Sequence, residues 1–210
     1  RYGLQVFGED ALGVALDEFM AWPDDGIGDE DLADHQPLFY PWFIFNWEYE
    51  ADPDFPQLDG PEGTTIAELY AVQKANRLNQ LETQIIEATA RQPFSFYEIQ
   101  ETRPGRGYRI RDILRGNVSD VTEKKGSERS RRGDILFAQV TQIDSITMLT
   151  GCGTILIPPK MKPELIRFKK WMLESEDSIT SDSLYQYDLE IRELYFHIFY
   201  SLMEPPELQN

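Results

Sequence analysis

The spacing of apolar residues changes twice along the chain, after residue 92 and again after residue 159. Residues 1–92 carry apolar side chains mainly at helical spacing. Residues 93–159 show the alternation of strands, and helical spacing returns in residues 160–210. Because strands and helices are segregated along the chain, the sequence predicts an α+β fold with these three segments as its domains.

The middle segment, residues 93–159, predicts five short strands joined by tight turns. Arg103-Pro104-Gly105-Arg106 suits a type II turn, because proline and glycine fit its two central positions. Five short strands this close together predict a central curved antiparallel sheet or a small β-barrel. The predicted strands are residues 94–101, 107–114, 119–124, 134–143 and 146–158.

The flanking segments predict helices with recognisable ends. Thr65 with Glu68, and Asn79 with Glu82, form two capping-box patterns at helix N-termini. Two C-terminal helices are predicted, at residues 163–175 and 181–203. The second is apolar on nearly every side, so it either packs deeply or meets chain beyond this segment.

Charge is unevenly distributed along the sequence. The formal net charge is −17, and residues 1–92 hold 4 basic and 19 acidic residues. Residues 103–132 hold ten basic and four acidic residues, a local net charge of +6. The sequence therefore predicts an acidic helical N-terminal region followed by a β-module with a basic surface.

The basic residues of the β-module form the candidate binding surface. Arg109, Arg111 and Arg115 are expected on one strand face, with about 7 Å between residues two apart. The loop between the third and fourth strands adds five more cations. The full predicted set is Arg106, Arg109, Arg111, Arg115, Lys124, Lys125, Arg129, Arg131 and Arg132.

Three roles for this surface stay open at the level of sequence. It can bind a protein partner, bind single-stranded nucleic acid or phosphate, or dock on the acidic N-terminal region. Phe96, Tyr97 and Tyr108 would supply stacking surfaces for bases, but each fits the core equally well. The net charge of −17 disfavours nucleic acid, because it repels phosphates at long range.

The predicted hairpin limits how much of the basic surface is unpaired. A two-residue turn at Pro104-Gly105 places Arg111 opposite Glu98. The same turn places Arg109 opposite Gln100. Part of the arginine stripe is therefore expected to be neutralised across the hairpin.

No motif in the sequence supports catalysis or a bound metal. Cys152, the only cysteine, lies between two glycines in a predicted tight turn with no histidine nearby. Glu193 and His197 lie four residues apart on a predicted helix, without the spacing of a di-iron site. The acidic stretch 52–63 departs from the EF-hand pattern. The sequence thus leans against an enzyme, predicts no metal site, and leaves a carboxylate-based hydrolase as the catalytic alternative.

The sequence also predicts no membrane span. Its longest apolar run, residues 37–45, is about half of the roughly 20 residues that a membrane helix needs. With a single cysteine and no disulfide framework, we expect a reducing, cytoplasmic setting. The start at Arg1, without a methionine, predicts a segment of a longer protein.

Three stretches resemble a group of uncharacterised bacterial proteins: Pro41–Trp47, Pro93–Leu114 and Arg131–Pro159. Members of that group often carry a SEC-C motif, a short cysteine-rich zinc element, which implies contact with a partner protein or a surface. One cysteine cannot form this motif, so zinc is expected only through a SEC-C motif outside this segment. The resemblance and the lack of catalytic motifs predict a non-catalytic bacterial interaction module that binds a protein partner.

Overall fold

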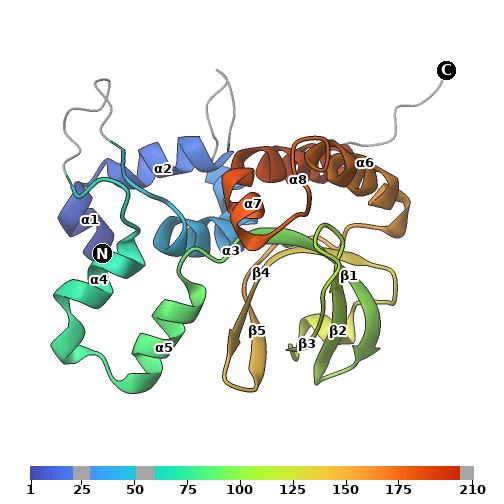
Figure 1. Cartoon of the computed structure of the whole chain (residues 1–210), viewed down its shortest axis with the longest axis horizontal. Coiled ribbons are helices and arrows are strands. Elements are labelled where there is room, and N and C mark those ends of the chain that lie inside the picture. Colours follow the sequence, from blue (N-terminus) through green and yellow to red (C-terminus); the bar gives the residue numbers. More distant parts are fainter. Residues whose placement is uncertain (21–28, 51–59, 204–210) are drawn as a thin grey trace. The chain divides into compact units, whose positions relative to one another are not determined.

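A computed structural model describes residues 1–20, 29–50 and 60–203 (Figure 1). Helices come first, strands follow, and helices end the described chain, so the predicted α+β class is confirmed. The helices are α1 (Tyr2–Phe7), α2 (Ala11–Met20), α3 (Asp29–Phe45), α4 (Ile66–Gln73), α5 (Gln80–Thr89), α6 (Lys162–Met172), α7 (Ser181–Gln186) and α8 (Asp188–Met203). The strands are β1 (Phe94–Arg103), β2 (Gly107–Asp112), β3 (Val118–Thr122), β4 (Ile135–Ile143) and β5 (Ile146–Cys152).

The chain divides into two compact units. The first unit contains Arg1–Pro93 together with Ala138–Thr154. The second contains Phe94–Phe137 together with the chain from Ile155 onward. Both units are therefore built from two separate stretches of sequence.

Aromatic packing and helix caps build the first unit. Phe39 of α3 contacts Phe19 of α2, with ring centroids 5.4 Å apart. The capping box that begins α4 is confirmed, because the Thr65 side chain accepts from the Glu68 N–H and the Glu68 carboxylate accepts from the Thr65 N–H. The box at Asn79, which begins α5, is confirmed in the same way. These caps supply partners to backbone donors that a helix start leaves open.

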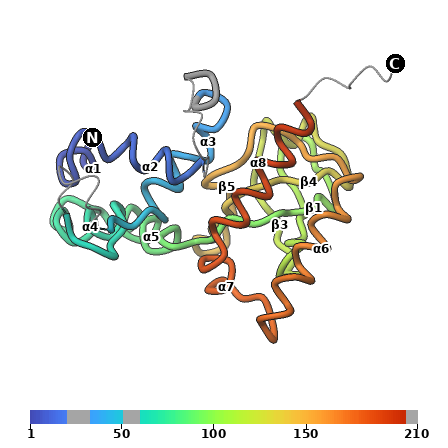
Figure 2. Tube along the Cα trace, turned by 90° about the horizontal axis from the view of Figure 1, so that it is seen from above, coloured from blue at the N-terminus to red at the C-terminus, as the bar shows by residue number. Residues whose placement is uncertain are grey.

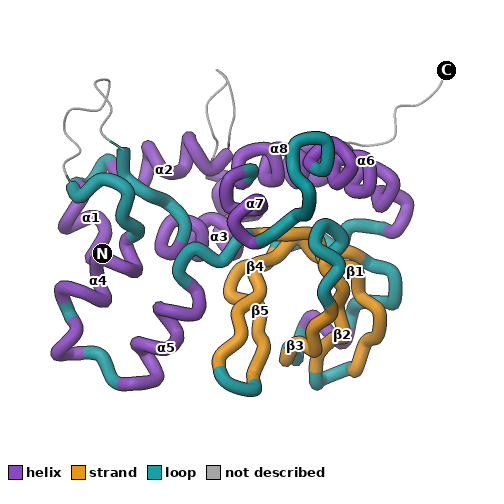
Figure 3. Tube along the Cα trace, viewed as in Figure 1, coloured by secondary structure: helices purple, strands orange, loops and turns teal. Residues whose placement is uncertain are grey.

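The five strands form a closed barrel in the order β1-β2-β3-β5-β4 (Figure 3). The pairs β1–β2, β2–β3 and β4–β5 are antiparallel. Gly107 at the start of β2 has φ +150, and an added Cβ would lie 1.9 Å from the Val121 carbonyl oxygen of β3. Only glycine therefore lets the two backbones approach this closely.

The β1–β2 hairpin confirms one predicted cross-strand pair and corrects the other. Arg111 lies opposite Glu98, as predicted, but Arg109 lies opposite Glu101 instead of Gln100. The register shifts at Gln100, between Ile99 and Glu101. The hairpin connection has three residues instead of the predicted two, so the pairs next to the turn are displaced by one position. An extra residue at Gln100, a β-bulge, restores the predicted register for Glu98 and Arg111.

The turn of this hairpin keeps the predicted type II features. Gly105 has φ +72, and the Arg106 N–H donates to the Arg103 carbonyl at 2.9 Å. Positive φ at the second central position is what a type II turn requires.

Three helices, rather than the predicted two, follow the strands. The long helix expected at residues 181–203 is interrupted at Tyr187, which leaves helical geometry with φ −96 and ψ 24. The Tyr187 ring packs edge-on against Trp171 of α6, with centroids 5.4 Å apart. This long-range contact accompanies the break and is invisible in the local pattern.

Helix α8 packs deeply into the second unit. Tyr195 of α8 is fully buried and stacks on Phe137, with ring centroids 4.5 Å apart. Figures 1 and 2 show α6 and α8 side by side over β1. Deep packing thus explains a helix that is apolar on nearly every side.

Among the helices described, none is long and apolar enough to cross a membrane.

Candidate functional site

The loop between β3 and β4 is held in a defined conformation by its own side chains. Ser127 is buried within a 3-10 turn at Gly126–Glu128. Its hydroxyl donates to the Lys124 carbonyl at 2.8 Å and accepts from the Gly105 N–H at 3.0 Å. One serine therefore ties the middle of the loop to the tip of the β1–β2 hairpin.

Both ends of the loop are also fixed to this hairpin. At its start, the Glu123 N–H donates to the Arg106 carbonyl at 3.2 Å. At its end, Ile99 and the Gly133–Asp134 backbone exchange two hydrogen bonds of 2.8 Å. The loop backbone is thus anchored at three places on β1 and its turn.

Eight of the nine predicted basic side chains are exposed. Of these eight, only Arg109 forms an ion pair within the described part of the chain, at 4.0 Å from Asp120. Five of the others belong to the loop and will be called the basic loop: Lys124, Lys125, Arg129, Arg131 and Arg132. The remaining exposed residues are Arg106 in the hairpin turn and Arg109 and Arg111 on β2.

Arg111 keeps its predicted neighbour without pairing with it. Glu98 lies opposite, but its carboxylate accepts from the Lys162 ammonium at 2.5 Å and from the Gln100 amide at 2.7 Å. Arg111 forms no ion pair with any residue that the structure describes. Lys162, at the start of α6, therefore neutralises the Glu98 charge that was predicted to pair with Arg111.

Arg115 does not share the strand face of Arg109 and Arg111, contrary to the alternation pattern. Strand β2 ends at Asp112, and the following turn brings the Arg115 Nε to 2.7 Å from the Asp112 carboxylate. Its guanidinium also donates to the Tyr97 hydroxyl at 3.2 Å and to the Ser181 hydroxyl at 2.7 Å. Arg115 is thus a structural cation that is 16% exposed.

Burial and charge shape the titration of this internal cluster. Burial, followed by the Asp112 charge, raises the pKa of Tyr97 above its usual range, so its hydroxyl stays protonated. Burial opposes the charge of Arg115, but Tyr97 and Asp112 outweigh it and raise the pKa of the guanidinium. Asp112 also accepts from the Ser95 hydroxyl at 2.8 Å and from the Leu114 N–H at 2.9 Å. Its oxygens are therefore occupied by structural bonds.

The aromatic residues near the basic loop belong to the core. Phe96, Tyr97 and Tyr108 are 0%, 3% and 2% exposed. All three are therefore core residues and not stacking surfaces for bases. Phe94 and Phe137, the other aromatic residues between positions 94 and 137, are buried as well. This stretch therefore offers no aromatic surface on which a base can stack.

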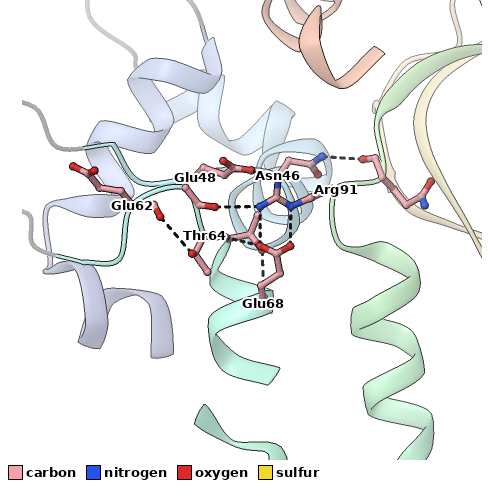
Figure 4. Close-up of polar contacts among 9 residues, drawn as sticks. Asn46, Glu48, Glu62, Thr64, Glu68 and Arg91 are labelled. Carbon is pink, nitrogen blue, oxygen red and sulfur yellow. Dashed lines mark hydrogen bonds and ion pairs between the residues drawn. The ribbon is translucent and has the colours of Figure 1, made fainter. Parts of the chain in front are cut away.

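Sequence reasoning missed a polar cluster around Arg91 (Figure 4). Its guanidinium contacts the Glu68 carboxylate at 2.7 Å, the Glu48 carboxylate at 2.8 Å and the Gly63 carbonyl at 3.1 Å. The hydrogen bond from Arg91 lowers the pKa of Glu68, although partial burial opposes this shift. The capping-box glutamate was the only local signal. Because these donors are engaged, the cluster is a structural clamp.

The catalytic and metal candidates remain scattered. No group of three or more potential metal ligands occurs in the ranges that the structure describes. Glu193 and His197 are both exposed on α8. Cys152 is not in a tight turn: it is the last residue of β5 and pairs with Ala138. The acidic stretch 52–63 lies largely outside the described residues.

Comparison with known proteins identifies a family but no activity. A model described as "Family of unknown function (DUF7986)" matches residues 55–186, more than half of the chain. No curated protein and no solved structure matches the sequence.

Proposed function

We propose that this chain, which belongs to the DUF7986 family of unknown function, is a non-catalytic binding module that docks an acidic segment of a partner protein. The observation that carries the proposal is the basic loop. Its five cations are exposed, form no ion pair with any described residue, and stand on a backbone anchored at three places. Because the backbone is already ordered, an anionic partner that binds has to immobilise only the cationic side chains.

The surroundings of the basic loop favour charge recognition over base stacking. The aromatic side chains of residues 94–137 are buried, so a strand of nucleic acid would be held by its phosphates alone. A polypeptide rich in glutamate or aspartate needs no stacking surface. The resemblance to SEC-C proteins, the bacterial origin and the cytoplasmic location stay predictions.

Single-stranded nucleic acid is the second candidate, and the strand order supports it. A closed five-stranded barrel in the order β1-β2-β3-β5-β4 is the arrangement of OB-folds, which bind oligonucleotides with β2, β3 and the β1–β2 loop. Arg106 lies in that loop, and Arg109 and Arg111 lie exposed on β2. This support is an analogy of fold, because folds of this kind host many functions.

Fluorescence anisotropy with two labelled probes tests the proposal. The probes are a peptide of about ten glutamates and a single-stranded oligonucleotide of similar charge, each titrated at low and high salt. The Arg129→Glu/Arg131→Glu/Arg132→Glu variant should lose at least about tenfold in affinity for the peptide. High salt should weaken the binding of the unaltered chain.

A matched control separates local contact from overall repulsion. Arg77→Glu/Arg167→Glu/Lys170→Glu changes the net charge equally, at three exposed cations outside the basic loop. It should keep affinity for the peptide within about threefold, because the basic loop is intact and salt screens charges elsewhere on the surface. Equal losses in both variants would reject docking on the basic loop. Preferential binding of the oligonucleotide would replace the first candidate with the second.

A further inference from the structure

The first unit contains a pocket of about 360 Å³ between its helices. This volume lies within the range of small-molecule sites, roughly 300–1,000 Å³. It is too small for a helix, because a cylinder about 10 Å wide fills about 420 Å³ within a single turn of about 5.4 Å. Its apolar and aromatic lining includes Tyr2, Leu4, Tyr40, Phe43, Ile44 and Tyr70.

The chemistry of the pocket wall is apolar with a single cation. Arg1 is the only charged residue among the described residues that line it. No carboxylate from the described chain faces the space. Such a wall favours an apolar ligand and an anionic group near Arg1, whereas a cationic group would be repelled by Arg1 and would find no carboxylate among the described lining residues.

Two apolar side chains of the wall remain unusually exposed. Tyr40 is 41% exposed and Ile44 is 38% exposed, although both lie on α3 beside buried Phe43. Covering these side chains with an apolar ligand would remove their surface from water, which is favourable. The wall therefore has apolar area that a ligand can still bury.

The wall is held in place by contacts on either side of the pocket. Tyr2 of α1 packs edge-on against Tyr70 of α4, with ring centroids 4.9 Å apart. Gly3 lies so close to α4 that an added Cβ would be 2.6 Å from the Ile66 side chain. The pocket is therefore defined before any ligand binds, which lowers the entropic cost of binding.

We propose that this pocket binds a small amphiphile: an apolar chain of about ten carbon atoms with a carboxylate head at Arg1. The length follows from the volume, because at about 30 Å³ for each methylene-sized group the pocket holds about twelve such groups, which is ten carbon atoms and two carboxylate oxygens. The carboxylate follows from the one cation in the wall. This site is separate in sequence from the basic loop, so the proposal stands independently of the proposed function.

Calorimetric titration with three probes of equal chain length tests the ligand class. Decanoate should bind most tightly, decanol more weakly, and decylamine at least about tenfold more weakly than decanoate. Arg1→Ala should weaken decanoate binding at least about fivefold and leave decanol within twofold. Equal binding of all three probes, or of decanoate to both chains, would overturn the carboxylate assignment.

A pair of matched substitutions tests the location. Ile44→Trp places a larger side chain in the pocket wall, whereas Ile146→Trp makes the same change at an exposed position of β5 that does not line the pocket. The first should weaken decanoate binding at least about tenfold, and the second should leave it unchanged within about twofold. Both sites are partly exposed, so both variants are expected to fold. Undiminished binding to Ile44→Trp, or no binding to the unaltered chain, would overturn the proposal.

Discussion

Arg91 shows how a single residue can join segments that are far apart in sequence. Its backbone has φ 56, a left-handed conformation that costs about 1 kcal/mol or more for a residue other than glycine. Its side chain meets two carboxylates and a carbonyl oxygen between positions 48 and 68. The clamp therefore offsets local strain with charge-assisted hydrogen bonds.

The Arg91 clamp predicts a pH dependence of stability. Arg91 lowers the pKa of Glu68, so this carboxylate stabilises the fold above its ordinary pKa. The contribution is lost as pH falls through the lowered pKa of the folded state. Arg91→Gly removes the side chain and also relieves the strain of φ 56, so the pH dependence is the informative quantity: the substitution should be about 1 kcal/mol more destabilising at about pH 7 than at about pH 3. Urea unfolding at both pH values measures this, and a cost that does not change with pH would contradict it.

Substitutions at two glycines separate the energetic cost of backbone strain from the cost of steric crowding. Gly107→Ala combines positive φ with a Cβ 1.9 Å from the Val121 carbonyl oxygen, so it should destabilise by about 2–4 kcal/mol. Gly116→Ala has φ +93 but meets no atom within 4 Å, so it should cost about 1 kcal/mol. Thermal unfolding of both variants compares them. Equal destabilisation would show that the approach of β2 and β3 does not require glycine.

At the level of elements, the basic loop and the β1–β2 hairpin stabilise each other. Ser127 connects them through two hydrogen bonds. The backbone of Ile99 forms two hydrogen bonds with Gly133 and Asp134 at the end of the loop. The conformation of the basic loop therefore depends on Ser127, which is uncharged. A search for cations alone would not select Ser127.

Two serines in the same loop make this dependence testable. Ser127→Ala removes two hydrogen bonds and should destabilise by about 1–2 kcal/mol, with faster hydrogen exchange at the Gly105 amide. Ser130→Ala is the control, because the buried Ser130 hydroxyl has no hydrogen-bond partner in the described structure, and its loss should be neutral or mildly stabilising. Similar effects of both substitutions would mean that Ser127 does not hold the loop.

The elements that the sequence predicts well are those governed by local rules. Alternation predicts all five strands, and capping boxes predict the starts of α4 and α5. The break at Tyr187 coincides with a contact to Trp171, which is 16 positions away and which no local pattern contains. The candidate site shows the same limitation of local patterns. Alternation places Arg115 on the face of Arg109 and Arg111, but β2 ends at Asp112, and the Arg115 side chain instead forms an ion pair with Asp112.

At the level of the whole molecule, the chain passes from one compact unit to the other three times, after Pro93, Phe137 and Thr154. The second of these passages lies inside β4. The family segment, residues 55–186, contains all five strands but neither unit in full. The boundaries of the family segment therefore do not coincide with those of either compact unit.

This organisation predicts how fragments behave. A fragment of residues 1–93 lacks Gln139, whose amide donates to the Asn46 side chain and to the Gln92 carbonyl, both at 2.8 Å. It also lacks β5, which contacts α3. We expect this fragment to show no cooperative thermal transition, whereas residues 1–154 should show one by circular dichroism. A sharp transition in the shorter fragment would contradict the division into units.

The discontinuity of the first unit also sets an order of events on the ribosome. The first 93 residues leave the exit tunnel before Ala138–Thr154, the stretch that completes their unit, has been made. At about 5–20 residues per second, translation of residues 94–154 takes about 3–12 seconds. During that interval α3 lacks its contact with β5, so its apolar side chains are open to chaperones and to neighbouring nascent chains. Slow codons between positions 93 and 154 would lengthen this exposure and lower the yield of folded protein.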